Sequence, residues 1–184
     1  PEQKTTDEIS MTVPAKYVTL SNGRLASQKT NKDGTRTDTW KMELPHSPYL
    51  FMMAVGDFKV YHDKWRNKPV DYYMEPKYAP YAKEIFGGTP EIIEFYSKTL
   101  GIDYPWNKYA QIVVRDYVSG AMENTTATLH GEFLNTTHRQ LIDAYYDFGH
   151  QTIAHELFHQ WFGDYVTAES WSNLTMNDSF ADFS

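Results

Sequence analysis

Residues 155–159 read His-Glu-Leu-Phe-His, and no other stretch says as much about this chain. On a helix, residues four positions apart project from the same face, about one turn from each other. His155 and His159 could therefore place two imidazole nitrogens on one tetrahedral zinc ion, with Glu156 beside them to act on the attacking water. The alternative is a buried amphipathic helix in which both histidines only pack against their neighbours.

A catalytic zinc ion usually has three protein ligands and one open position for water, so a third ligand is expected further along the chain. Asp178 follows His159 after eighteen intervening residues, at the start of a helix expected over residues 177–184 with Asn177 as its cap. A return of that length can bring a second helix against the first. An ordinary carboxylate favoured by the helix dipole is the alternative, but beside the His-Glu-x-x-His pattern we favour Asp178 as the third ligand.

The composition excludes several classes of function. The chain has 184 residues, of which 41% are hydrophobic and 22% charged, which fits a globular protein with one sizeable core or two small ones. A net charge of −7 without a basic patch argues against a nucleic-acid partner. Because there is no cysteine, any metal must be held by histidine and carboxylate. The longest apolar stretch, residues 49–55, is strand-sized, so no transmembrane segment is expected.

The ends of the chain suggest a piece of a longer polypeptide. The first residue is Pro1 rather than methionine, and Ser184 falls inside the helix expected over residues 177–184. The lack of a targeting segment therefore carries no information, and the sequence leaves the compartment undecided between exported and cytoplasmic.

The pattern along the chain predicts an α+β fold in which strands come first. Antiparallel β-structure is expected over the first 75 residues, with two-residue hairpin turns at Asn22-Gly23 and Asp33-Gly34. The strands expected there are residues 11–20, 24–30, 35–44, 49–55, 58–62 and 70–74. The aromatic residues of this part are expected to pack on the faces of the sheet.

Helical spacing replaces strand spacing near residue 80. Thr89 is the expected N-cap of a helix, with Pro90 as its first helical residue and Gly101 at its end. A buried strand is expected within residues 109–117, around a β-branched run, and residues 128–133 are a candidate neighbouring strand. The helix that carries the histidines is expected over residues 147–162, before Gly163.

Two separate motifs resemble those of the M1 aminopeptidases, which are gluzincins with a thermolysin-like catalytic domain. Residues 155–164, Trp171 and residues 177–181 resemble that family's zinc-binding segment, and residues 120–124 are identical to its exopeptidase motif. Residues 48–58 also resemble the last strands of the family's N-terminal β-domain. The resemblance implies that residues 1–75 are the C-terminal part of an antiparallel β-domain. Residues 76–184 would then be the N-terminal part of a truncated thermolysin-like catalytic domain.

The resemblance also implies roles for individual residues. One zinc ion per chain would be held by His155, His159 and Asp178, with Glu156 as the general base. The substrates would be peptides with a free N-terminus, whose α-ammonium group binds a glutamate. That glutamate would be Glu123, within the substrate-binding segment Gly120, Ala121, Met122, Glu123 and Asn124. Asp182, one turn after Asp178, is either a partner that orients a histidine or an exposed helix carboxylate.

Two departures from the family lead us to expect impaired activity in this chain. The family carries glutamate where this chain has Asp178, whose carboxylate lies about one C–C bond, roughly 1.5 Å, nearer the backbone. Family members also use a downstream tyrosine on the oxyanion, and this chain ends before it; losing such a donor costs about 10²–10³ in rate. The alternatives are a non-catalytic M1-like homologue that binds peptides or partners, a thermolysin-like endopeptidase, which the exopeptidase motif opposes, and a lipid-epoxide hydrolase.

Overall fold

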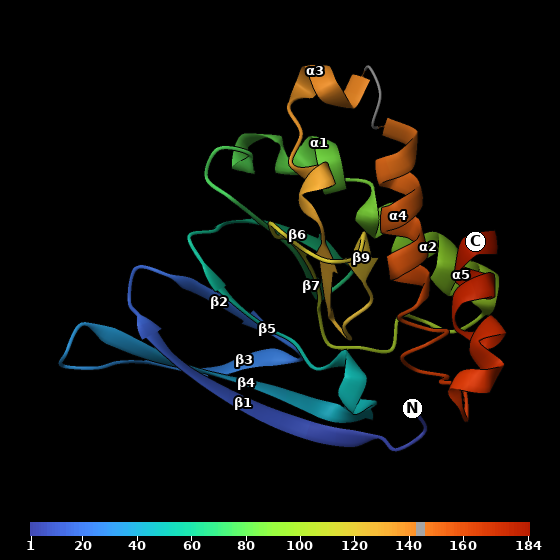
Figure 1. Ribbon diagram of the computed structural model, residues 1–184, viewed down its shortest axis with the longest axis horizontal. Coiled ribbons are helices and arrows are strands. Elements are labelled where there is room, and N and C mark those ends of the chain that lie inside the picture. Colours follow the sequence, from blue (N-terminus) through green and yellow to red (C-terminus); the bar gives the residue numbers. More distant parts are fainter. Residues whose placement is uncertain (143–145) are drawn as a thin grey trace.

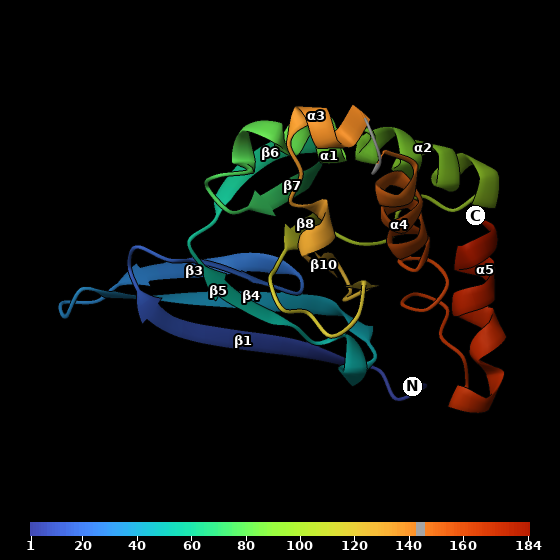
Figure 2. The same ribbon diagram turned by 45° about the horizontal axis from the view of Figure 1, so that its top comes forward.

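The chain has an α+β fold, as predicted, in the computed structural model, which describes residues 1–142 and 146–184. Figure 1 shows long antiparallel strands on one side of the molecule and helices gathered on the other. Figure 2 shows the same arrangement with the helices above the N-terminal strands. Across the described residues, no helix has both the length and the apolar character that a membrane crossing requires.

The N-terminal strands form two small antiparallel sheets. One contains β1 (Thr5–Pro14), β4 (Thr35–His46) and β3 (Arg24–Thr30), in the order β1-β4-β3. The other pairs β2 (Val18–Ser21) with β5 (Met53–Gly56). The predicted hairpin turn at residues 33–34 joins β3 to β4.

The predicted hairpin at Asn22-Gly23 is wrong, because β2 and β3 on either side of it belong to different sheets. The side chain of Asn22 donates to the carbonyl oxygens of Leu50 and Thr125, at 3.0 and 2.7 Å. Gly23 has a φ of 72°, and a Cβ at this position would lie 2.0 Å from the carbonyl oxygen of Lys41. These contacts between distant segments, rather than strand pairing, determine the turn.

A five-stranded sheet in the order β6-β7-β8-β10-β9 forms the centre of the molecule. Its strands are β6 (Lys59–Trp65), β7 (Lys68–Met74), β8 (Tyr109–Val113), β10 (Ala127–His130) and β9 (Ala121–Met122). Strand β8 is buried along its whole length and lies parallel to both β7 and β10. Strands from before and after residue 75 thus share one sheet, and the domain boundary expected there stays a prediction.

The helices are α1 (Ala82–Phe86), α2 (Thr89–Leu100), α3 (His138–Gln140), α4 (Tyr146–Phe158) and α5 (Asp178–Phe183). Helix α2 begins one residue earlier than predicted, because Thr89 is already helical and Gly88 precedes it, while Gly101 ends it as expected. Asn177 does not cap α5 with its side chain. Its Oδ1 instead accepts a hydrogen bond from the Ala168 N–H, at 3.1 Å.

Two apolar cores lie on opposite faces of the five-stranded sheet. Successive residues of a strand point to opposite faces, so Tyr72 belongs to the core under the helices and Tyr73 to the core under the N-terminal sheets. The helical core includes Tyr96 of α2 together with Ile153 and Leu157 of α4. Because α4 buries this face, residues on its opposite face are directed away from the core.

Candidate metal centre and substrate pocket

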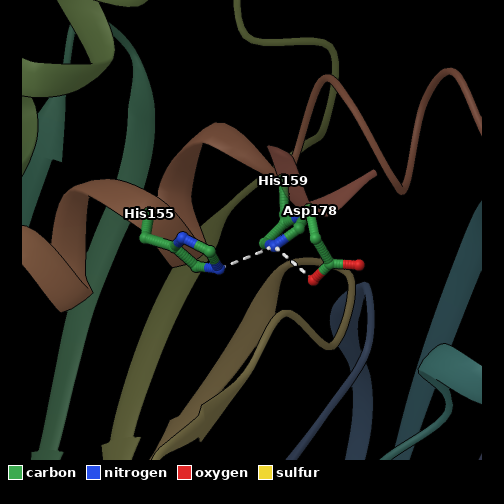
Figure 3. Close-up of side chains that lie close together, drawn as sticks. All are labelled: His155, His159 and Asp178. Carbon is green, nitrogen blue, oxygen red and sulfur yellow. Dashed lines mark hydrogen bonds and ion pairs between the residues drawn. The ribbon is translucent and has the colours of Figure 1, made fainter. Parts of the chain in front are cut away.

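His155 lies in α4 and His159 directly follows its last residue, and their side chains approach each other closely (Figure 3). Their Nε2 atoms are 3.0 Å apart, and the ring planes meet at 79°. The i, i+4 spacing brings the two rings together if the backbone between them is helical. This condition is met, because the His159 N–H donates to the His155 carbonyl, at 3.3 Å.

Both histidines are oriented through their Nδ1 atoms. The Nδ1 of His159 donates to the carbonyl oxygen of Phe162, at 3.0 Å, and that of His155 lies 3.0 Å from Oδ1 of Asp182. Both partners accept hydrogen bonds, so each Nδ1 carries the hydrogen and each Nε2 presents a lone pair. Gly163, with a φ of 127°, lets the loop pass close to His159, where a Cβ would lie 3.0 Å from Nδ1.

Asp178 completes a group of three donors, but it stands further away. Its Oδ1 lies 4.0 Å from Nε2 of His159, and its side chain is about half exposed. Donor atoms of a tetrahedral zinc ion with bonds of 2.0–2.2 Å lie about 3.3–3.5 Å apart. The two histidine nitrogens, at 3.0 Å, are about 0.3 Å closer than this spacing, and the carboxylate of Asp178 would have to move in by about 0.5 Å.

Glu156 lies beside the histidines as a buried carboxyl group. Glu156 is only 6% exposed, and its Oε2 has no hydrogen-bond partner among the described residues. Burial raises the pKa of Glu156 well above its usual range, and the nearby charges of Glu123 and Asp178 raise it further. A carboxyl group with a raised pKa that faces a pocket is suited to transferring protons.

The exopeptidase-like segment forms the opposite wall of this pocket, which has a volume of about 820 Å³. Gly120, Ala121, Met122 and Glu123 all line it, and Ala121 and Met122 form the short edge strand β9. Asn124 does not line it, because the residue is buried and its side chain donates to the Leu50 carbonyl, at 3.2 Å. A substrate-binding role for Asn124 stays a prediction.

Three aromatic side chains also line the pocket: Tyr49 from the N-terminal half, Phe148 and Trp171. Tyr49 comes from the 3-10 segment Pro48–Leu50 and packs edge-on against Trp171, with ring centroids 4.9 Å apart. Asn177 donates to its hydroxyl group at 3.4 Å, and burial raises the pKa of the Tyr49 phenol. Tyr49 was not predicted to lie here, because the sequence pattern placed it in a strand of the N-terminal β-structure.

Gln160 connects the histidine helix to the segment of Glu123, and the sequence did not identify it. The residue is fully buried, and its Nε2 donates to the Glu123 carbonyl, at 3.0 Å. Its Oε1 accepts the Thr126 N–H, at 2.9 Å, and its own carbonyl accepts the indole N–H of Trp106, at 2.8 Å. The amide therefore ties the backbone at Glu123 to the residues that follow α4.

We expect Gln160→Leu to lower the free energy of unfolding by about 2–4 kcal/mol, because a buried carbonyl and a buried N–H each lose their partner. Urea unfolding followed by circular dichroism measures this change. Gln151→Leu, the same substitution at an exposed position of α4, is the matched control and should stay within about 0.5 kcal/mol of the parent. Similar losses for the two variants would contradict the role of Gln160.

Comparison with known proteins adds relatives along the whole chain. The model described as the peptidase family M1 domain matches residues 85–184. The glutamyl aminopeptidase of Rattus norvegicus is 30% identical over 191 residues, covering 100% of this chain and 20% of that protein. Aminopeptidase N of Streptomyces lividans is 31% identical, and endoplasmic reticulum aminopeptidase 1 of Homo sapiens 30%, each over 100% of this chain. The chain spans about a fifth of the length of these curated relatives.

Proposed function

Because this chain belongs to peptidase family M1, we propose that it carries the metal-binding part of a zinc-dependent aminopeptidase. One observation supports the zinc ion most directly: the Nε2 lone pairs of His155 and His159 face each other at 3.0 Å. Such lone pairs repel unless a proton or a metal ion lies between them. A zinc ion bound by both nitrogens would remove this repulsion.

In the proposed reaction, His155, His159 and Asp178 would hold one zinc ion, which when bound supplies a Lewis acid that acidifies water and polarises the peptide carbonyl. Glu156 would take the proton of the attacking water and deliver it to the amine that leaves as the first peptide bond breaks. Glu123 would accept charge-assisted hydrogen bonds from the free α-ammonium group of the peptide. The substrates are therefore peptides with a free N-terminus.

We expect the chain to cleave peptides with a free N-terminus at least about tenfold faster than their N-acetylated forms. Acetylation removes the charged donor, and a hydrogen bond to a charged group contributes about 1.5–3 kcal/mol. The measurement is the release of the first residue from matched peptide pairs, with and without a chelator. Glu123→Gln should abolish the preference.

Equal cleavage of free and acetylated peptides would contradict the role of Glu123, and cleavage that survives metal removal would contradict the role of zinc.

A second candidate function is favoured by the 4.0 Å separation between Asp178 and His159. In that case the chain is a non-catalytic member that binds peptides or partners through a weakened or lost metal site. Elemental analysis of the purified chain distinguishes the two, since this candidate predicts no retained zinc.

A further inference from the structure

A second group of possible metal ligands lies in the same pocket. It shares one residue, His159, with the group that would hold the proposed zinc ion. Glu123, Glu156 and His159 each offer one ligand atom, and these three atoms all lie within 4.8 Å of one another. They come from the end of β9 and from α4, and Gln160 ties the two segments together. The group is therefore built by the fold rather than by chance neighbours on a surface.

The electrostatics of this group favour a bound cation. Oε2 of Glu156 is buried without a hydrogen-bond partner among the described residues, and an unpaired buried carboxylate is costly. The pocket lining, which lies within the described part of the chain, contains no lysine or arginine. It does contain four carboxylates: Glu123, Glu156, Asp178 and Asp182. The positive charge must therefore come from a proton or from a bound cation, and a divalent cation can interact with several of these carboxylates at once.

The two groups of ligands compete for one atom. The Nδ1 of His159 is used in its hydrogen bond to Phe162, so only Nε2 is available to a metal ion. Nε2 can belong either to the group with His155 and Asp178 or to the group with Glu123 and Glu156. The first group has two imidazoles and one carboxylate, which suits zinc, and the second has two carboxylates and one imidazole, which suits a harder ion such as Mn²⁺.

We propose that Glu123, Glu156 and His159 form a second position for a divalent cation, which overlaps the zinc position at His159 and accepts Mn²⁺. Only one of the two positions is filled at a time. The proposal concerns metal affinity and holds whether or not the chain is a peptidase. If the proposed reaction is correct, Mn²⁺ at this position inhibits it, because the ion occupies both the general base and the carboxylate that binds the substrate ammonium.

Titration of the metal-free chain of 184 residues with Mn²⁺, followed by electron paramagnetic resonance, tests the proposal. We expect one Mn²⁺ per chain, with Glu123→Gln weakening its binding at least about tenfold, since even an indirect partner of a metal ligand contributes that much. Asp178→Asn, the matched removal of a carboxylate from the other group, should weaken Mn²⁺ binding much less than Glu123→Gln does. Glu156→Gln is the second variant if Glu123→Gln fails to fold.

Three results would overturn the proposal. The first is no Mn²⁺ binding at millimolar concentrations. The second is loss of Mn²⁺ affinity in Asp178→Asn but not in Glu123→Gln or Glu156→Gln, which would put Mn²⁺ in the zinc position. The third concerns competition: one equivalent of zinc should displace all the Mn²⁺, because zinc binds such ligands more tightly and His159 is shared. Simultaneous binding of both ions would show that the positions do not overlap.

Discussion

Glu156→Gln in this chain should lower the rate at which N-terminal residues are released by about 10²–10⁴, the usual contribution of a general base. Glutamine keeps the shape of the buried side chain but cannot accept the proton of the attacking water. The zinc content should not fall, because the proposed zinc ligands are the neighbouring histidines and Asp178. The rate is measured by peptide release and the metal by elemental analysis of the same sample.

A loss of rate means little unless the protein still folds, so Glu91→Gln serves as the control. Glu91 is an exposed residue in the first turn of α2, away from the pocket lining, and its substitution should leave the rate unchanged. If Glu156→Gln retained the parental rate, another group would have to be the base. If it lost zinc together with activity, the two effects could not be separated and Glu156 would have to be regarded as a ligand.

Asp178→Glu should tighten zinc binding by up to about 10²-fold. The Asp178 oxygen stands 4.0 Å from Nε2 of His159, and the additional methylene extends the carboxylate by roughly 1.5 Å. Four-ligand structural zinc sites bind with about 10–16 kcal/mol, so one well-placed ligand contributes on the order of 3 kcal/mol. Competition with a chromophoric chelator at fixed pH measures the change.

The matched control for this gain is Asp182→Glu, which makes the same substitution one turn further along α5. The carboxylate of Asp182 contacts Nδ1 of His155 rather than an Nε2 atom, so a longer side chain there should not tighten zinc binding. An unchanged or weaker affinity in Asp178→Glu would mean that α5 already brings the aspartate to the ion. The 4.0 Å separation would then overstate how loosely this ligand is held.

The features that the sequence could predict depend on short segments. Gly101 ends a helix and Asp33-Gly34 joins two strands because those conformations are determined by neighbouring residues. The closeness of His155 and His159 is likewise a property of one helix, so their spacing was enough to predict it. The α+β fold follows from the order of strand-like and helix-like segments.

The features that the sequence could not predict depend on partners far away in the chain. Asn22 looked like a hairpin residue, but its partners are Leu50 and Thr125, which no local pattern reveals. Gln160 is a polar residue among aromatic ones, and its hydrogen bond to the Glu123 carbonyl depends on where that distant segment lies. The separation between Asp178 and the histidines depends on how α5 packs. The shorter aspartate side chain indicated a longer distance to the metal ion, but the sequence could not say how long.

The bond from Asn22 to Thr125 has a practical consequence for anyone who trims this chain. Thr125 directly follows the exopeptidase-like segment, so a residue of the N-terminal half anchors the chain next to a wall of the pocket. Strand β8 likewise takes β7 as one of its two neighbours. An expression clone limited to residues 85–184 would keep both histidines and still lose Tyr49, the Asn22 anchor and one edge of the central sheet. The bounds of the match to the family model are therefore a poor guide to where a stable recombinant unit begins.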